Sequence, residues 1–338
     1  MQRCIKMAEK GLGKTFPNPL VGSVIVYKDN IIGEGWHQKA GSSHAEANAI
    51  SNVQNKEFLS KSTLYVSLEP CNHFGKTPPC SDLIIKNKIP RVVIASTDPN
   101  PLVAGKGIEK LKKAGCEVLV GVLKKEADFL NRRFFTFHNL KRPYIILKWA
   151  QTKNNFIAPI QKKTDNPEIF WITNNYSKQR VHKWRSEEAA ILVGVQTVIN
   201  DNPELTTREW TGNNPLRIVI DPNRRTPKNS KLFQDNIPTL FFTKDPIQLL
   251  PNKKEQKIVS PFSIKNILKE CYKLKIQSII IEGGLRTLEY FIKDNLWDEA
   301  RVFKTEKKIK TGIMAPELKK ISNQTEIYEG DILDIYFN

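Results

Sequence analysis

The chain has 338 residues, more than one hydrophobic core usually holds, so two domains are expected. Hydrophobic residues make up 40% of it, and no apolar run approaches the ~20 residues that span a bilayer, which excludes a protein built on membrane helices. The formal net charge of +18 is scattered, so a codon bias toward Lys, Asn and Ile explains it better than a nucleic-acid-binding surface, and it also suits anionic small molecules.

The N-terminal residues and the cysteines favour the cytoplasm. Residues 1–19 lack the long apolar segment of a secretory signal peptide, so we expect a cytoplasmic protein. That compartment is reducing and disfavours a structural disulfide. Of the five cysteines only Cys71 and Cys80 are clustered, which is not the pattern of a disulfide framework.

In chain order, the first half predicts strands and helices that alternate. Residues 20–37 contain two apolar runs around Asp29 and Asn30, which indicates a β-hairpin. A helix is expected after Gly41, with Ser43 as its N-cap. The next elements are a strand over 62–71 that Pro70 terminates, a helix over 80–88, a strand over 91–96, a helix over 107–115, a strand over 116–122, and one amphipathic helix from residue 127 that runs into a basic linker near 144.

The second half begins with a new strand over 144–152 and repeats the alternation. Helices are expected over 177–189, 263–274 and 285–295, and strands over 190–194, 217–221, 238–243 and 278–284. Such alternation is typical of an α/β sheet covered on both faces. We therefore predict two α/β domains, at 1–142 and 143–338.

The stretch EPCNHFGKTPPCSD supplies two thiols, Cys71 and Cys80, and the stretch SHAEANA supplies His44 with Glu46 two residues later. A catalytic zinc ion takes three protein ligands, leaves the fourth position for water, and lowers the pKa of that water to about 7. The set of His44, Cys71 and Cys80 therefore predicts a zinc site. A non-ligand Glu46 that moves protons beside it matches the layout of zinc deaminases.

A structural zinc site is the main alternative. It needs a fourth ligand, for which His73 is available, but it gives no role to the His-x-Glu pair or to the strand–Pro–Cys junction. Helix N-termini expected after Ser43 and around Cys80 would also hold both thiols as thiolates. The residues therefore favour a catalytic site.

Four stretches of the first half carry a family resemblance: PNPLVGSVIV, GEGWHQKAGSSHAEANAI, YVSLEPCNHFGKTPPC and DPNPLVAGKGIEKLKKAG. With them the chain resembles the bifunctional riboflavin-biosynthesis deaminase–reductases. The resemblance implies a cytidine-deaminase-like α/β/α domain that removes the 2-amino group of a diaminopyrimidinone bearing phosphoribosylamine. It also implies one Zn²⁺ per chain, held by His44, Cys71 and Cys80, with Glu46 as the proton donor.

Other residues of this half suit such a substrate. Asn18 lies between two prolines, where a rigid turn can aim its amide at a pyrimidine edge; a plain turn asparagine is the alternative. Lys76 and His73 can reach the ribose phosphate as charge-assisted donors, and solvated loop residues are the alternative. Residues 98–107 either roof the site with backbone or form an ordinary turn before a helix.

In the second half, residues 278–288 give a strand, a Gly-Gly turn and a helix start, whose backbone N–H groups suit a phosphate. Residues 192–208 cluster a Thr, an Asp and an Arg after a buried strand, as ligand clefts of α/β sheets do. A capped turn at 200–203 also explains much of this cluster. These signals alone do not identify a ligand.

The stretches YIILKWAQT, WITNNYSKQRVHKWRSEEAAILVGVQTVINDNPELTTR, PLRIVID, IIIEGGLRTLEYFI and LWDEARVF make this half similar to the family's reductase domain, whose fold is like dihydrofolate reductase. The resemblance implies NADPH-dependent reduction of the ribosylamino group to its open-chain ribitylamino form. By position it places the cofactor against Ala150, Trp171, Thr197, Asp201, Gly284, Leu285, Arg286, Thr287, Leu288, Glu289 and Tyr290. It places the substrate against Arg185, Leu205, Arg208 and Glu282, with Lys148 as a further phosphate ligand.

Two of these residues have competing interpretations: Trp171 as a core aromatic, and Arg185 as a surface ion pair with Glu187 or Glu188. The sequence also departs from the family, which usually has Asp-Gly where this chain has Asn154-Asn155. Asn tolerates the left-handed conformation better than most residues, so the turn can survive. Pro222 removes a possible N–H donor to the cofactor.

Two alternative functions follow from these observations. The Asn-Asn change leaves open a deaminase whose second domain is only a scaffold, and the charge leaves open an RNA-binding editing deaminase. We expect instead a homo-oligomeric enzyme that acts on a small phosphoribosylated pyrimidine and has neither nucleic acid nor membrane as a partner.

Overall fold

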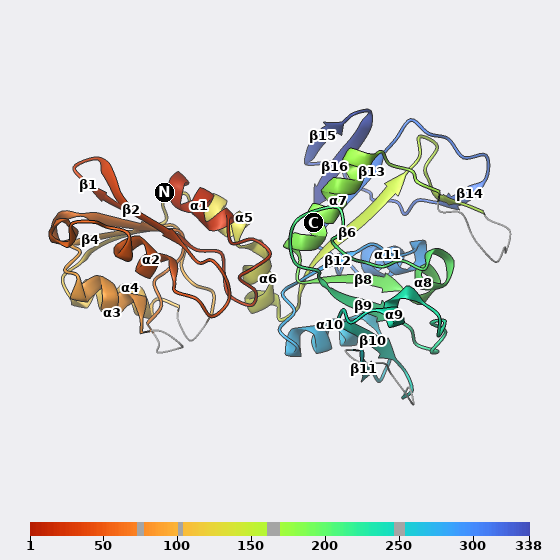
Figure 1. Cartoon of the computed structure of the whole chain (residues 1–338), viewed down its shortest axis with the longest axis horizontal. Helices are drawn as coiled ribbons and strands as arrows, with labels where there is room; N and C mark the ends of the chain where they lie inside the picture. The colour runs from red at the N-terminus through yellow and green to blue at the C-terminus, as the bar shows by residue number, and fades with distance from the viewer. Residues whose placement is uncertain (73–77, 101–103, 161–169, 247–253) are drawn as a thin grey trace. The chain divides into compact units, whose positions relative to one another are not determined.

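The computed structural model describes residues 1–72, 78–100, 104–160, 170–246 and 254–338, and it divides into two compact units, Met1–Lys141 and Arg142–Asn338 (Figure 1). Each unit is an α/β structure built on its own sheet, which confirms the predicted fold class. No helix among the described residues is long and apolar enough to cross a membrane.

The first unit contains a five-stranded sheet in the order β2-β1-β3-β4-β5. Strand β1 pairs antiparallel with β2 and β3, whereas β3, β4 and β5 run parallel. The elements are α1 (Gln2–Glu9), β1 (Gly22–Tyr27), β2 (Asn30–Trp36), α2 (Ala45–Ser51), the 3-10 helix η1 (Lys56–Lys61), β3 (Thr63–Val66), α3 (Cys80–Lys86), β4 (Arg91–Ile94), α4 (Lys106–Lys113), β5 (Glu117–Val120), α5 (Lys124–Leu130) and α6 (Arg132–Leu140).

The core of the first unit lies between this sheet and helices α2, α3 and α4. Every second residue of the strands faces these helices, as the two-residue period of a strand requires: Leu64 and Val66 from β3, and Val92 and Ile94 from β4. Because β3 and β4 are parallel, the loops that follow them emerge at the same edge of the sheet.

The expected elements of this unit are present, with three differences. The helix after Gly41 has His44 rather than Ser43 as its N-cap, and strand β3 ends at Val66, before Pro70. The single helix expected from residue 127 is two helices, α5 and α6, with Asn131 between them. The Asn131 side chain accepts from the Leu20 N–H and donates to the Leu20 carbonyl, each at 2.8 Å. The apolar pattern runs through the break and so conceals it.

The second unit contains a nine-stranded sheet in the order β11-β10-β9-β8-β12-β6-β13-β16-β15, and β7 pairs separately with β14. In this order, neighbouring strands from β11 through to β13 are parallel. Strand β16 is antiparallel to both of its neighbours, β13 and β15. Its strands are β6 (Tyr144–Gln151), β7 (Phe156–Pro159), β8 (Ala190–Gly194), β9 (Leu216–Ile220), β10 (Thr239–Thr243), β11 (Lys254–Ile258), β12 (Ser278–Ile281), β13 (Glu299–Lys304), β14 (Gly312–Met314), β15 (Gln324–Tyr328) and β16 (Asp331–Phe337). Its helices are α7 (Asn175–Glu187), α8 (Val195–Asp201), α9 (Lys231–Gln234), α10 (Ile264–Lys273) and α11 (Leu285–Lys293).

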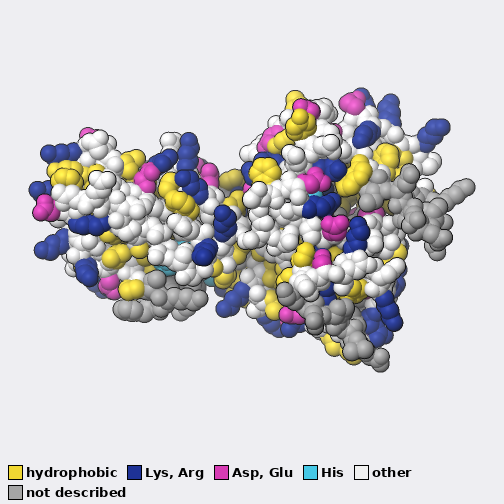
Figure 2. All heavy atoms as spheres, viewed as in Figure 1, with side chains coloured by type: hydrophobic (Ala, Val, Ile, Leu, Met, Phe, Trp, Pro, Cys, Tyr) yellow, Lys and Arg dark blue, Asp and Glu magenta, His cyan; other side chains and the backbone are white. Residues whose placement is uncertain are grey.

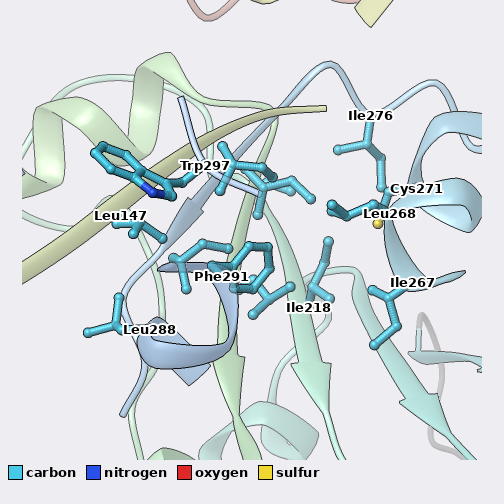
Figure 3. Packing of buried hydrophobic residues seen from close by; sticks show 14 of the residues in the cluster. Leu147, Ile218, Ile267, Leu268, Cys271, Ile276, Leu288, Phe291 and Trp297 are labelled. Carbon is cyan, nitrogen blue, oxygen red and sulfur yellow. The ribbon is translucent and has the colours of Figure 1, made fainter. Parts of the chain in front are cut away.

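Two hydrophobic clusters cover the two faces of this sheet. On one face, α10 and α11 bury Leu268, Cys271 and Phe291 against strand residues such as Leu147 and Ile218 (Figure 3). On the other face, α7, α8 and α9 bury Trp184, Val198 and Leu232. The helices that follow the neighbouring strands β8 and β12 therefore lie on opposite faces. In α/β sheets such a switch point leaves a crevice at the carboxyl ends of the strands, where ligands bind.

Candidate active sites

The two loops at the edge of the first unit bring three metal-binding side chains together. His44 caps α2, Cys71 follows β3, and Cys80 is the first residue of α3. Their ligand atoms all lie within 4.8 Å of one another, with His44 Nδ1 at 3.5 Å from Cys71 Sγ and at 3.3 Å from Cys80 Sγ. The structure therefore places the three predicted ligands where they could hold one metal ion.

The spacing of these atoms fits zinc. Bonds of about 2.3 Å to sulfur and 2.0 Å to nitrogen in a tetrahedral site put a nitrogen and a sulfur ligand about 3.5 Å apart, close to the distances found. All five cysteines are free thiols, so no disulfide joins Cys71 to Cys80. Cys80 begins α3, and its N–H donates to Cys71 Sγ at 3.3 Å. A cation between these groups favours both thiolates.

The electrostatics of the site suit proton transfer. The pKa of Cys71 is lowered to about 4, first by the hydrogen bond from Cys80 and then by His44. The pKa of the Cys80 thiol is raised by its hydrogen bond to Cys71 and by burial. Glu46, in the first turn of α2, is buried, and burial followed by the charge of Cys71 raises its pKa to about 7. A carboxyl group with a pKa near neutrality can both accept and donate a proton at physiological pH.

A second histidine, His37, extends this site, and the sequence analysis missed it. His37 is buried, and its Nδ1 lies 3.2 Å from the carbonyl oxygen of Ser43, the residue before His44. A carbonyl only accepts, so Nδ1 carries the proton and Nε2 of the neutral ring is an acceptor. Nε2 lies 3.0 Å from Asn18 Nδ2, which therefore donates to it. This hydrogen bond does not use the Asn18 Oδ1 atom. Its place at the end of β2, within the GEGWH stretch, is the signal that could have identified it.

Asn18 is thus joined through His37 to Ser43, the residue before His44, and its expected contact with a pyrimidine edge stays a prediction. The two residues assigned to the ribose phosphate, Lys76 and His73, lie outside the described residues.

In the second unit, a buried ion-pair cluster lies at the carboxyl end of β12. Glu282 accepts from Arg185 Nε and Nη2, both at 2.8 Å, and its Oε2 lies 3.8 Å from Lys148 Nζ. Burial alone would raise the pKa of Glu282, but Arg185 and Lys148 outweigh it and lower the pKa to about 2. Three of the expected substrate residues therefore lie together. The surface ion pair with Glu187 or Glu188 considered for Arg185 is wrong, because the Arg185 side chain is only 12% exposed.

The loop after α8 is attached to this cluster and carries the other two expected substrate residues, Leu205 and Arg208. Arg185 Nη1 donates to the Thr206 carbonyl at 3.0 Å, and the Glu209 N–H donates to His182 Nδ1 at 3.5 Å. Burial, followed by Arg185 and Arg208, lowers the pKa of His182 to about 4, so its ring is neutral at physiological pH. The sequence analysis did not single out His182.

Thr206 supplies a polar atom that the protein leaves for a ligand. Its hydroxyl is buried and has no hydrogen-bond partner among the described residues. Buried polar groups normally have partners, so this hydroxyl, in a residue whose carbonyl accepts from Arg185, is consistent with a polar substrate.

Two glycine-containing turns approach each other closely at the switch point. A side chain at Gly283 would lie 2.6 Å from Val193 Cα, and one at Gly194 would lie 2.6 Å from Thr287 Oγ1. Gly284 has a φ of 50° and faces Thr197 Oγ1. The starts of α8 and α11 therefore face each other across backbone. Helix starts offer N–H groups that suit phosphates, and the expected contact of this turn with the cofactor stays a prediction.

The remaining residues assigned to the cofactor are placed as follows. Leu288 is 2% exposed and packs in the core, so it can offer only its backbone, and Tyr290 is exposed on the same helix (Figure 3). Asp201 ends α8, and Ala150 is half-buried on β6. Trp171 is 46% exposed, so its interpretation as a core aromatic is wrong, and Lys178 Nζ lies 4.0 Å above its ring.

The departures from the family pattern are accommodated by the backbone. Asn155 has a φ of 62°, the left-handed conformation that glycine usually takes, and its Oδ1 accepts from Gln151 Nε2. Its neighbour Asn154 donates to the Ile309 carbonyl at 2.7 Å. The turn after β6 is therefore retained. The Pro222 carbonyl accepts from the Lys244 N–H.

Lys and Arg side chains are spread over the visible face of each unit and alternate with acidic residues (Figure 2). They form no single basic stripe on that face, which agrees with the scatter of charge along the sequence.

Known proteins resemble this chain over nearly its whole length. Residues 1–96 match the family model of the cytidine and deoxycytidylate deaminase zinc-binding region, and residues 143–305 match that of the RibD C-terminal domain. The riboflavin biosynthesis protein RibD of Aquifex aeolicus is 43% identical over 324 residues, which cover 94% of this chain and 89% of that protein. RibD of Escherichia coli is 33% identical over 322 residues, 90% of this chain and 86% of that protein.

Solved structures agree with these matches. The crystal structure of a diaminohydroxyphosphoribosylaminopyrimidine deaminase/5-amino-6-(5-phosphoribosylamino)uracil reductase from Thermotoga maritima is 35% identical, with a TM-score of 0.90 over 99% of this chain and 96% of that chain. RibD of Acinetobacter baumannii is 31% identical, with a TM-score of 0.89 over 99% of this chain and 97% of that one.

Proposed function

The chain belongs to the RibD family, and from that membership together with the site geometry we propose which residues carry out its two reactions. It is a bifunctional enzyme of riboflavin biosynthesis, a zinc deaminase and an NADPH-dependent reductase. The observation that carries the assignment is the convergence of His44, Cys71 and Cys80 next to a buried carboxyl group. We assign the deaminase to residues 1–142 and the reductase to residues 143–338.

The deaminase replaces the 2-amino group of the pyrimidinone by oxygen from water and releases ammonia. His44, Cys71 and Cys80 would hold the zinc ion, which would supply a water that is nucleophilic at neutral pH. Glu46 takes one proton of the attacking water and passes it to a ring nitrogen. It then takes the remaining hydroxyl proton from the tetrahedral carbon and gives it to the amino group, so a C=O bond forms as the C–N bond breaks and ammonia leaves.

Specificity for the pyrimidine edge is assigned to Asn18. The Ser43 carbonyl fixes the His37 tautomer, and His37 in turn fixes the Asn18 amide with its oxygen free to accept. An acceptor in this position suits the N–H or amino group of a diaminopyrimidinone. Lys76 is assigned to the ribose phosphate on the strength of the resemblance alone.

The reductase opens the ribosylamino ring and reduces its first carbon to give the ribityl chain. NADPH would supply the hydride, and we assign its contacts to Ala150, Trp171, Thr197, Asp201 and the Gly284–Tyr290 segment. Arg185, Lys148 and Arg208 orient the anionic substrate. Glu282 stays ionised at neutral pH and holds Arg185 in place. Leu205 lies in the loop after α8, next to Thr206, whose carbonyl accepts from Arg185.

Glu46→Gln tests the proton transfer. We expect this variant to keep its zinc and its NADPH-dependent reductase activity on the deaminated substrate, while ammonia release from the diamino substrate is abolished. Full deaminase activity in Glu46→Gln would overturn the assignment, and loss of both activities together would show a folding defect instead. The retained reductase activity also decides against a scaffold role for residues 143–338.

We also assign the compartment and the partners. A reducing cytoplasm keeps the thiols of Cys71 and Cys80 available as ligands. Exposed apolar residues on the edge strands β5 and β15, including Leu119 and Ile327, support a homo-oligomer. The scattered charge supports the absence of a nucleic-acid partner. Tight RNA binding that falls steeply with salt would contradict that last assignment.

A further inference from the structure

One buried carboxylate in the first unit has no role in the mechanism above. Glu69 lies between the end of β3 and the ligand Cys71, and it is only 4% exposed. Its two oxygens accept four backbone N–H groups: Oε2 from Asp98 at 3.3 Å and Gly105 at 3.0 Å, and Oε1 from Gly107 at 3.0 Å and Ile108 at 3.3 Å.

These four donors come from both ends of one loop. Asp98 lies just after β4, whereas Gly107 and Ile108 lie in the first turn of α4. The carboxylate therefore binds an open helix start, where the helix dipole favours a negative charge, and closes the loop on itself. A side chain at Gly107 would lie 2.0 Å from the Pro70 carbonyl oxygen, so the helix start is pressed against the Glu69–Pro70 backbone.

The same backbone is attached to the metal ligands on its other side. The Cys71 carbonyl accepts from the Ser81 N–H at 3.2 Å, and the Ser81 hydroxyl donates to the Asn72 side chain at 3.2 Å. Asn72 in turn donates to the Lys106 carbonyl at 3.4 Å. The segment from Glu69 to Asn72 thus lies between the start of α3, which carries Cys80, and the start of α4.

The edge of the sheet brings the loop to the reacting centre. Strands β3 and β4 are adjacent and parallel, so residues 97–100 emerge beside the segment that carries Cys71. Asp98 and Asn100 are partly exposed there, and the Asp98 side chain accepts from the Asn100 N–H at 2.8 Å.

We propose that Glu69 is a positioning residue of the deaminase: its carboxylate fixes residues 97–100 as a wall of the substrate pocket beside the metal ligands. The proposal rests on the deaminase function assigned to this unit. Glu69 touches neither metal nor substrate. Its effect is on substrate binding, because it sets the position of a loop rather than the chemistry of the water.

Glu69→Gln is the informative change, because it preserves volume and removes the charge. One of the two oxygens becomes an amide NH₂, which cannot accept from the N–H groups that face it. The loop therefore loses two of its four hydrogen bonds to this side chain. Glu109→Gln is the matched control, since Glu109 is an exposed carboxylate on α4 that undergoes the same chemical change. Glu69→Asp keeps the charge but is one methylene shorter.

The test measures kcat and KM for ammonia release, zinc per chain, and amide hydrogen exchange over residues 97–110. For Glu69→Gln we expect KM to rise about tenfold or more, faster exchange in this loop, and unchanged zinc and reductase activity. The KM and the exchange rate of Glu69→Asp should lie between those of wild type and Glu69→Gln. If Glu69→Gln does not fold, Glu69→Asp serves as the test variant. Glu109→Gln should behave as wild type.

Two results would overturn the proposal. A lower melting temperature with unchanged KM and kcat in both Glu69 variants would show a purely structural helix cap. A loss of activity that follows a loss of zinc would show that Glu69 acts on the metal site. Failure of the deaminase assignment itself is distinguishable, because the wild-type enzyme and Glu109→Gln would then also release no ammonia.

Discussion

Replacing Arg185 by Met should destabilise the second unit markedly, because it leaves a buried carboxylate without its main partner. Glu282 is 7% exposed at its side chain and receives two hydrogen bonds from Arg185. In Arg185→Met, Glu282 keeps the ion pair with Lys148, whose Nζ lies 3.8 Å from Glu282 Oε2. Breaking a buried pair on one side typically costs about 3–5 kcal/mol.

The pKa of Glu282 gives an independent magnitude. It falls from 4.5 to about 2 in the folded protein. At 1.36 kcal/mol per pH unit, this difference corresponds to about 3 kcal/mol of stability. Because the folded pKa is the lower one, the contribution is present above pH 4.5 and is lost as the pH falls toward 2. For a domain of about 200 residues, a loss of 3–4 kcal/mol lowers the melting temperature by about 6–16 °C.

The assay is thermal unfolding of the full chain at pH 7 and at pH 3, with near-UV circular dichroism. We expect Arg185→Met to lower the transition of the second unit at pH 7 and to approach wild type at pH 3. The triple variant Arg185→Met/Lys148→Met/Glu282→Leu removes the whole buried charge cluster and should recover much of the loss, since apolar replacement of buried ion pairs is often neutral. The reasoning is refuted if the single variant unfolds like wild type at pH 7, or if the triple variant is less stable than the single one.

Two other variants probe smaller features. Asn155→Val should destabilise the second unit by about 1–2 kcal/mol, since a β-branched residue does not tolerate the φ of 62°. Asn155→Gly should stay within about 1 kcal/mol of wild type. Equal stability of the two variants in thermal melts would contradict this. His37→Phe removes both the bond to the Ser43 carbonyl and the acceptor for Asn18, so kcat/KM for ammonia release should fall about tenfold or more with zinc retained; an unchanged kcat/KM would show that Asn18 is oriented by other contacts.

The sequence predicted the metal site because its signal is local. A His-x-Glu pair at a helix start and a Pro-Cys junction after a strand place their side chains by short-range geometry, so His44, Glu46, Cys71 and Cys80 could be identified without a structure. The alternation of strands and helices likewise gave the α/β class in both halves.

The features that escaped depend on contacts between distant residues. Asn131 breaks a helix because it pairs with Leu20, 111 positions away. Glu69 accepts from backbone N–H groups at Asp98, Gly105, Gly107 and Ile108, and this contact leaves no periodic trace in the sequence. The same holds for the contact by which His37 orients Asn18. His182 was missed for the same reason, since its partner Glu209 is on another element. Leu288 shows the opposite case, in which a motif position is occupied by a core side chain.

The zinc content of the purified chain tests the central claim most directly, because the deaminase assignment depends on His44, Cys71 and Cys80 sharing one ion. We predict one zinc per chain in the wild-type protein and nearly none in Cys80→Ser, with ammonia release lost in parallel. A wild-type enzyme that releases ammonia without zinc, or a Cys80→Ser variant that retains a full equivalent of zinc, would contradict the account.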